Sequence, residues 1–378
     1  MKRDEKIIVA LTGCSHAVNH GYLLIFPTVL LLLQKEFSLG YLELGIIGNI
    51  MTFSYGLGAL PGGMIYNYLG PKKLYLLCFM GSAIAAILVG ASSNILLLTG
   101  GLALLGILGS IYHPMANSLI TAKVSEFGRA FGIHGAAGNV GLAAAPFVIG
   151  LVASCLGWQY AYFCSALPGI MLSVWSLFVD MSPRKEIRTT DQSASEQKSV
   201  SGHLSIYFSP PLVLLYLINM MHSFSFHGSL TFLPTYMAKR TSFHIFSLDS
   251  IAIGGMLSAI VLSMGVFGQY GGGILSQQPR LERKFLLLSI ISFPFILAMS
   301  FATDILLLIL ALIFFFFIFF LQPMNNTLLA RHTAMNMRGT AFGIYFFGAF
   351  GFGSLASSFS GYIAQKFGLQ WVFMGLSS

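Results

Sequence analysis

The sequence has little charge. Only 8% of its 378 residues are Asp, Glu, Lys or Arg, whereas charged residues make up about a quarter of a typical soluble domain. This shortage excludes a soluble globular protein, and the 56% of apolar residues indicates a chain that lies in a bilayer. The 41 glycines and 34 phenylalanines agree with this, because transmembrane helices use glycine for close packing.

Cysteine is scarce as well. The four cysteines, Cys14, Cys78, Cys155 and Cys164, stand in or beside apolar runs without CxxC or Cys/His spacing. This pattern excludes a disulfide framework, a redox motif and a zinc site of the usual spacing. We therefore predict no metal site and no cofactor. The sequence also lacks a nucleophile–base pair and a phosphate-binding loop, so we predict that the chain is not an enzyme.

The basic residues are scattered, although the formal net charge is +8. They form no stripe, which argues against a nucleic-acid partner. With the N-terminus inside, all but four of the 20 basic residues fall in cytoplasmic loops, the exceptions being Lys35, Lys239, Arg240 and Lys366. This asymmetry predicts a multi-pass protein of the bacterial inner membrane with a cytoplasmic N-terminus. The expected partners are the lipid bilayer and a small solute, and we expect a monomer.

Long apolar runs dominate the chain, and a membrane-spanning helix needs about 20 such residues. Eleven complete runs and the start of a twelfth near Leu369 are present, and we expect an all-α integral membrane protein. Residues 181–206 are hydrophilic, which predicts a cytoplasmic linker. They divide the chain into an N-terminal six-helix bundle, 1–180, and a C-terminal bundle, 207–378. The runs are Ile7–Leu33, Leu42–Tyr66, Lys73–Gly90, Ile95–Thr121, Ala130–Ser154, Gln159–Val179, Pro211–Met237, Ile251–Leu275, Phe285–Phe301, Ile305–Ala330 and Ala341–Ala364.

An internal repeat relates the two halves. The sequence Ala-Phe-Gly-Ile at 130–133 recurs at 341–344, and the same offset of 211 pairs Gly150 with Gly361, Gly157 with Gly368 and Gln159 with Gln370. At an offset of 209, HPMANSL at 113–119 matches QPMNNTL at 322–328. A 6+6 duplication around a cytoplasmic linker is typical of transporters whose halves rock around a site at the bilayer midplane.

The repeat also predicts a short last helix. Ser378 pairs with Leu167, whereas the matching sixth run continues to Val179. We therefore expect roughly a dozen residues of a twelfth spanning helix to be missing from this sequence, because a half-length helix cannot cross the hydrocarbon core.

The loop between the second and third runs carries a known signature. Residues 63–73, GMIYNYLGPKK, resemble the GxLxDRxGRR motif of the major facilitator superfamily, with Asn67 in place of the aspartate. This resemblance covers the whole chain and implies alternating access between two bundles. It implies that the aspartate position helps to latch the cytoplasmic gate, and Asn67 leaves at most a neutral hydrogen bond there. The predicted gating residues are Gly63, Asn67, Gly70, Lys72, Lys73, Arg129 and Pro146.

A narrower resemblance follows from three further motifs. Residues 15–21 (SHAVNHG), 109–114 (GSIYHP) and 129–141 (RAFGIHGAAGNVG) are similar to the HxxND, GxxxFHP and GIxGxGGNxG patterns of fosmidomycin-resistance-type exporters. Residues 141–150 (GLAAAPFVIG) also resemble the GxxxGPxxGG antiporter motif, with Ala145 and Ile149 where glycines are usual. The resemblance implies efflux by antiport and leaves the solute open.

Histidine supplies the chemistry available inside the membrane, because no Asp or Glu stands in the middle of any predicted run. Histidine exchanges protons near neutral pH, and an ionisable residue at membrane depth indicates function. His16, Asn19 and His20 share one helix face, and we take His113 as the first choice for proton coupling. At most one of His222 and His227 faces the cavity squarely, because they stand five residues apart on a helix. The predicted cavity residues are His16, Asn19, His20, His113, Asn117, His134, His222, Gln322 and Asn326.

Several interpretations stay open at this point. The preferred one is a secondary transporter that exports a small organic solute in exchange for protons, and a histidine-lined cavity suits an anionic or strongly polar solute. A facilitator or importer without proton coupling is the first alternative, and a non-transporting sensor or assembly protein with the same fold is the second. The polar side chains would in that case only bond neighbouring helices to one another.

Overall fold

The computed structural model describes residues 1–125, 127–181, 209–243, 248–276, 278–333 and 338–377, and every regular element in these ranges is helical. For residues 59–68, 121, 127–129, 131, 330, 338–340 and 342 only the helical backbone is described. The predicted linker lies almost wholly outside the described residues.

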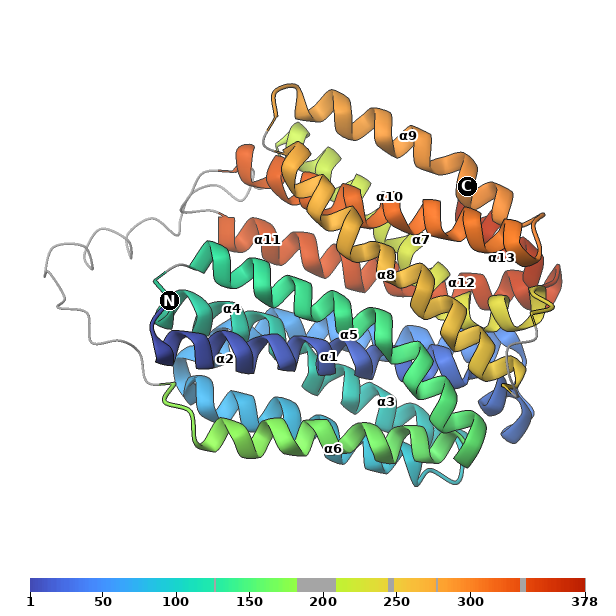
Figure 1. Cartoon of the computed structure of the whole chain (residues 1–378), viewed down its shortest axis with the longest axis horizontal. Helices are drawn as coiled ribbons and strands as arrows, with labels where there is room; N and C mark the ends of the chain where they lie inside the picture. The colour runs from blue at the N-terminus through green and yellow to red at the C-terminus, as the bar shows by residue number, and fades with distance from the viewer. Residues whose placement is uncertain (126, 182–208, 244–247, 277, 334–337, 378) are drawn as a thin grey trace, which may run out of the picture.

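The helices run side by side along the long axis of the molecule (Figure 1). Elements α1 to α6 form the N-terminal lobe and elements α7 to α13 form the C-terminal lobe. The elements are α1 (Arg3–Glu36), α2 (Tyr41–Gly90), α3 (Ile95–Ser110), α4 (Tyr112–Lys123), α5 (Phe127–Leu156), α6 (Trp158–Leu177), α7 (Pro210–Arg240), α8 (Ser250–Ser276), α9 (Leu281–Met299), α10 (Asp304–Arg331), α11 (Arg338–Phe347), the π-helical turn η3 (Gly348–Phe352), α12 (Gly353–Lys366), η4 (Leu369–Trp371) and α13 (Val372–Ser377).

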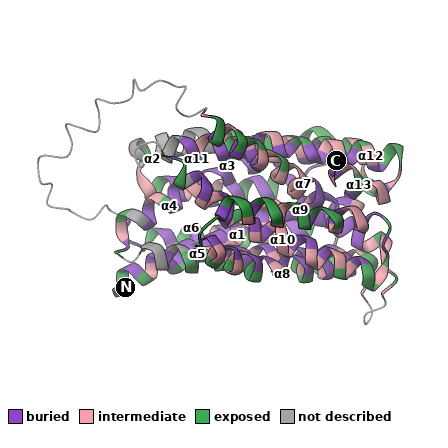
Figure 2. Ribbon diagram, turned by 90° about the horizontal axis from the view of Figure 1, so that it is seen from above, coloured by how far each residue is buried: buried purple, intermediate pink, exposed green. Residues whose placement is uncertain are grey.

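The outer surface of the bundle is apolar. Among the described residues, seven helical stretches are long and apolar enough to cross a membrane. Large apolar side chains such as Leu96, Phe178 and Met171 are exposed, at 82%, 83% and 70% of their surface, while buried residues line the inner faces of the helices (Figure 2). Lipid solvates such a surface, and water does not. The structure therefore confirms an all-α membrane fold.

The second and third predicted runs both lie in α2, which consists of two helices that meet at a kink at Gly70. Gly70 has a φ of 74°, a backbone conformation that glycine adopts without the steric cost that a side chain adds. This non-helical residue thus separates the two helices of α2.

The fourth predicted run is broken into α3 and α4 at Ile111. Pro114 follows three residues later, and because proline has no N–H it cannot bond the carbonyl of Ser110. The break places His113 in the first turn of α4, so Pro114 fixes where the histidine enters the bundle.

Backbone geometry agrees with the repeat in the sequence. Gly157 and Gly368 both precede a helical element and have φ values of 102° and 103°. At each position the side chain two residues later, Gln159 or Gln370, lies close to where a Cβ would stand. The paired residues therefore make the same turn in the two halves.

The two lobes pack closely at two related places. A Cβ at Gly255 of α8 would overlap the carbonyl oxygen of Pro146 in α5, and a Cβ at Gly45 of α2 would overlap the carbonyl oxygen of Ser357 in α12. Small residues permit such approach between membrane helices. Ser357 follows Pro146 by the repeat offset of 211, so the lobes are joined by pseudo-symmetric contacts.

Polar contacts close the end of the bundle that lies opposite the N-terminus. The Leu42 N–H donates to Gln365 Oε1 at 2.9 Å, and Lys239 Nζ donates to the Tyr41 hydroxyl at 2.6 Å. Each bond joins the N-terminal lobe to the C-terminal lobe. The structure therefore shows the lobes in contact at this far end.

Candidate functional site

Four histidines from three helices meet inside the N-terminal lobe, and we call them the histidine cluster: His16 and His20 of α1, His113 of α4 and His134 of α5. The ring centroid of His16 lies 4.4 Å from that of His20, 5.1 Å from that of His113 and 4.3 Å from that of His134. The fold thus brings together residues that are more than 100 positions apart.

Local structure explains how the rings converge. His16 and His20 are one turn apart on α1 and face the same side. His134 lies on α5 with 4% of its surface exposed, and its ring is stacked nearly parallel to that of His16. Neither α4 nor α5 contains an acidic residue. The acidic residues of α1 stand only at its two ends. The cluster is therefore a group of imidazoles without a carboxylate from its own helices.

A backbone contact fixes the orientation of His16. Its Nδ1 lies 2.9 Å from the carbonyl oxygen of His134. Because a carbonyl oxygen only accepts, Nδ1 of His16 carries the proton. The other ring nitrogen, Nε2, is buried and has no hydrogen-bond partner among the described residues. A lone pair thus points into the cluster.

Asn19 links the cluster to a helix break and to α2. Its Nδ2 donates to the carbonyl oxygen of Gly109 at 2.9 Å, close to where α3 ends, and its Oδ1 accepts from the Tyr55 hydroxyl at 3.0 Å. Asn19 is 1% exposed. Both ends of the amide are therefore satisfied within the protein, and the bonds hold Tyr55 beside the cluster.

Aromatic contacts continue from the cluster to the other lobe. The Tyr55 ring lies 6.4 Å from His113 and 5.0 Å from Phe350 of η3, and the Phe350 ring lies 5.2 Å from His227 of α7. We call these four residues the ring bridge. It runs across the boundary between the lobes, so the histidine cluster lies next to this boundary.

A second connection between the lobes consists of amides. Asn139 Nδ2 of α5 donates to Gln269 Oε1 of α8 at 2.9 Å, and Gln269 Nε2 donates to Gln322 Oε1 of α10 at 3.0 Å. We call Asn139, Gln269 and Gln322 the amide relay. Gln322, a predicted cavity residue, lies at its end in the C-terminal lobe. A ligand that enters between the lobes can exchange hydrogen bonds with these groups.

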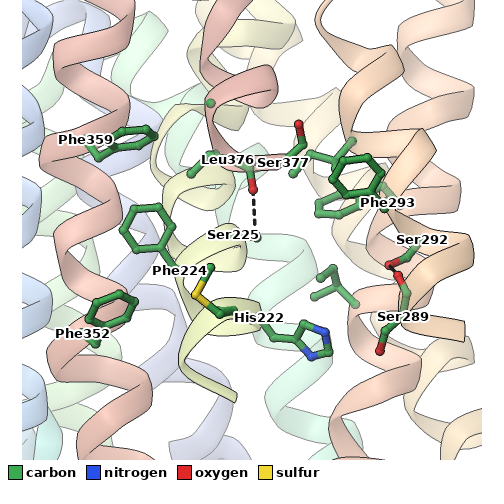
Figure 3. A pocket seen from close by; sticks show the side chains of 15 residues that line it. His222, Phe224, Ser225, Ser289, Ser292, Phe293, Phe352, Phe359, Leu376 and Ser377 are labelled. Atoms are coloured by element: carbon green, nitrogen blue, oxygen red, sulfur yellow. Dashed lines mark hydrogen bonds between the residues drawn. The ribbon is translucent and has the colours of Figure 1, made fainter. Parts of the chain in front are cut away.

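His222 lies apart from the cluster. It lines a cavity of about 400 Å³ inside the C-terminal lobe, between α7, α9, α10, α12 and α13, and its ring is 5.7 Å from Phe285. Figure 3 shows His222 with Phe224, Ser225 and the serines of α9 around this cavity. The histidine of α7 that belongs to the ring bridge is His227, which the sequence-based list of cavity residues left out.

The remaining predicted cavity residues take different positions. Asn117 lies one turn beyond His113 on α4 and is exposed. Asn326 on α10 is partly buried, and its Oδ1 has no hydrogen-bond partner among the described residues.

The predicted gating residues are partly described. Lys72 Nζ donates to the carbonyl oxygen of Leu177 at 2.8 Å, Lys73 is exposed, and Pro146 packs against Gly255 across the lobes. For three predicted gating residues, Gly63, Asn67 and Arg129, the structure describes only the helical backbone, so these predictions stay untested.

Five residues of the site were not in the sequence-based list: His227, Tyr55, Phe350, Asn139 and Gln269. Asn139 stands inside the GIxGxGGNxG-like motif and could have been found there. Tyr55, Phe350 and Gln269 carry no pattern of their own, and only the packing of the lobes gives them a role.

Comparison with known proteins agrees with the fold. The sequence profile of the Major Facilitator Superfamily matches residues 11–358. A probable sulfoacetate transporter of Cupriavidus necator is 26% identical over 65% of this chain and 59% of its own length. The multidrug resistance protein MdtG of Proteus mirabilis is 26% identical over 55% of this chain and 54% of its own length. The chain thus spans less than two thirds of the length of these relatives.

Solved structures give the same fold. A bacterial homologue of the human lysosomal transporter Spinster, in an inward-facing and unoccupied conformation, superimposes with a TM-score of 0.81 at 16% identity, over 96% of this chain and 83% of that one. These relatives and neighbours are membrane transporters and not enzymes. The family match over most of the chain, the two-lobed helical fold and the internal repeat agree, and the chain belongs to the major facilitator superfamily.

Proposed function

We propose that this chain exports a small organic anion across the bacterial inner membrane by alternating access of its two lobes, as a monomer with a cytoplasmic N-terminus. The observation that carries the proposal is the position of the histidine cluster, next to the ring bridge at the boundary between the lobes. Imidazole N–H groups donate hydrogen bonds to anionic oxygens, and no carboxylate from the same helices repels an anion there.

The solute class draws on two further observations. One relative is named for sulfoacetate and another for D-galactonate, and both compounds are small organic anions. The fosmidomycin-resistance-type motifs leave the solute open, and small phosphonates are therefore among the compounds to be tested. The solute class that we propose is a compact molecule with at least one carboxylate, sulfonate or phosphonate.

Export by proton exchange is the preferred direction and coupling. The exporter-type motifs and the multidrug resistance relative support efflux. Transport against a gradient needs an energy source, and exchange for protons supplies one without a phosphate-binding loop. The sequence-based assignment of the coupling proton to His113 stays a prediction.

A susceptibility panel tests the proposal. An efflux-deficient bacterial host expresses the wild type or the His113→Ala variant at matched membrane levels and is exposed to fosmidomycin and other small phosphonates. Protection by the wild type alone supports export through the histidine cluster. Equal sensitivity of the wild-type strain and the empty host, with the protein confirmed in the membrane, contradicts export of these compounds.

Import is the second candidate. It would need no proton coupling, which agrees with the lack of Asp or Glu in the middle of the predicted runs and with Asn67 in place of the aspartate. Uptake of labelled sulfoacetate into cells that express the chain distinguishes it from export, since an exporter lowers the cellular content and an importer raises it.

A further inference from the structure

We propose that His16, His20 and His113 form a binding site for a divalent transition-metal ion of the Zn²⁺ type. Each of these residues offers one ring nitrogen, and the three nitrogens lie within 4.8 Å of one another. The spacing within the sequence did not predict this site, because His113 joins the other two only through the fold. The inference goes beyond the proposed function and does not depend on transport.

The positions of the rings match a site with three histidine ligands. A Zn–N bond of about 2.1 Å places each ring centroid about 3.2 Å from the metal, so tetrahedral geometry separates the centroids by about 5 Å. The observed separations are 4.4 Å for His16 and His20, 5.1 Å for His16 and His113, and 5.9 Å for His20 and His113. Small rotations of the side chains therefore suffice to close the three nitrogens on an ion.

The hydrogen bonds around the site leave ligand atoms free. His16 donates from Nδ1 to the carbonyl oxygen of His134, and a ligating histidine typically holds its second nitrogen in this way. Nε2 of His16 and Nδ1 of His20 are buried without a hydrogen-bond partner among the described residues. A buried unpaired polar atom costs free energy, and a metal ion removes that cost at both atoms at once.

The ligand set selects the class of ion. Imidazole nitrogens suit Zn²⁺, Co²⁺, Ni²⁺ and Cu²⁺, whereas Ca²⁺ and Mg²⁺ require oxygen ligands. Three protein ligands leave the fourth tetrahedral position open for water or for an anionic oxygen. Such an oxygen would also balance the charge of the ion, since the helices of the cluster bring no carboxylate to it.

Titration of the purified full-length chain with Co²⁺ in detergent, after treatment with a chelator, tests the site. We expect one Co²⁺ per chain, the strong visible absorption of a tetrahedral ion, and displacement by Zn²⁺ but not by Mg²⁺. We expect His16→Gln and His113→Gln to weaken binding at least about 100-fold. The control variant His222→Gln keeps the wild-type affinity, because His222 lies in the other lobe.

A second measurement does not depend on the stability of any variant. X-ray absorption spectra of the Zn²⁺-loaded wild type are expected to show three imidazole ligands. Absence of saturable Co²⁺ binding, unchanged affinity in His113→Gln, or fewer than three imidazoles around Zn²⁺ overturns the proposal. Both measurements are made at equilibrium without flux, so a failure of the metal site and a failure of the transport proposal are seen separately.

Discussion

His16 and His134 are joined twice, by rings whose centroids lie 4.3 Å apart and by a hydrogen bond of 2.9 Å from Nδ1 of His16 to the backbone carbonyl oxygen of His134. The pair ties α1 to α5 at the centre of the N-terminal lobe. It also decides which nitrogen of His16 faces the cluster. The arrangement depends on Gly138, one turn beyond His134, because a Cβ there would overlap the His16 ring.

We expect Gly138→Ala to reduce transport about tenfold or more. The added methyl group must push the His16 ring out of its place, and overpacking of this kind costs about 1–3 kcal/mol. Gly135→Ala on the same helix is the matched control, since no atom lies within 4 Å of a Cβ at that position. Flux measured in proteoliposomes at equal protein content checks the pair. Equal flux in the two variants would show that the position of His16 does not matter for transport.

We expect Gly255→Ala to shift the protein toward the conformation that is open at the far end. A Cβ at Gly255 meets the carbonyl oxygen of Pro146. The variant therefore destabilises the conformation in which α5 and α8 touch here, and it does not destabilise a conformation in which they are apart. Distances between spin labels on the far ends of α5 and α8 report the populations. Gly273→Ala is the control on α8, where a Cβ meets nothing within 4 Å. An unchanged distance distribution in Gly255→Ala would contradict this account of the lobe contact.

The amide relay is expected to couple the lobes measurably. Asn139→Ala and Gln269→Ala each remove the bond between α5 and α8, and such bonds in membrane proteins contribute about 0.6 kcal/mol on average. We therefore measure the free energy of unfolding in a double-mutant cycle. The second substitution is expected to lower it by about 0.6 kcal/mol less when the first is already present. Strict additivity of the two effects is the result that would exclude the coupling.

Tyr55 combines a hydrogen bond with a ring contact, and two variants separate them. Tyr55→Phe loses the bond to Asn19 and keeps the ring beside Phe350, whereas Tyr55→Ala loses both. If the ring bridge communicates between the lobes, Tyr55→Phe retains most of the transport rate and Tyr55→Ala loses about tenfold or more. Similar rates in Tyr55→Ala and the wild type would remove the ring bridge from the mechanism.

Much of the fold was predictable because hydropathy and the repeat are local signals. Apolar runs marked the helices to within a few residues, and the repeat paired Gly157 with Gly368, which make the same turn in the two halves. The separation of the second run from the third agrees with the kink at Gly70. The division between α3 and α4 at Ile111 was not predicted, because hydropathy gives no backbone dihedral angles. The π-helical turn around Phe350 also carries no hydropathy signal.

The site was predictable only in part. Helical spacing put His16 and His20 on one face, and this is what the structure shows. Their approach to His113 and His134 depends on how three helices pack, which spacing within one helix cannot give. For the same reason, His227 was not distinguished from His222, and Gln269 was not noticed at all.

Flux of labelled solutes in proteoliposomes tests the central claim most directly. The wild type, His113→Ala and His222→Ala are compared with labelled sulfoacetate, galactonate and fosmidomycin, with and without an imposed pH gradient. The account predicts that the wild type and His222→Ala move at least one of these anions, faster with the gradient, and that His113→Ala moves it at least about tenfold more slowly. Transport by His113→Ala at the wild-type rate, or no transport of any of the three anions by folded wild-type protein, would contradict it.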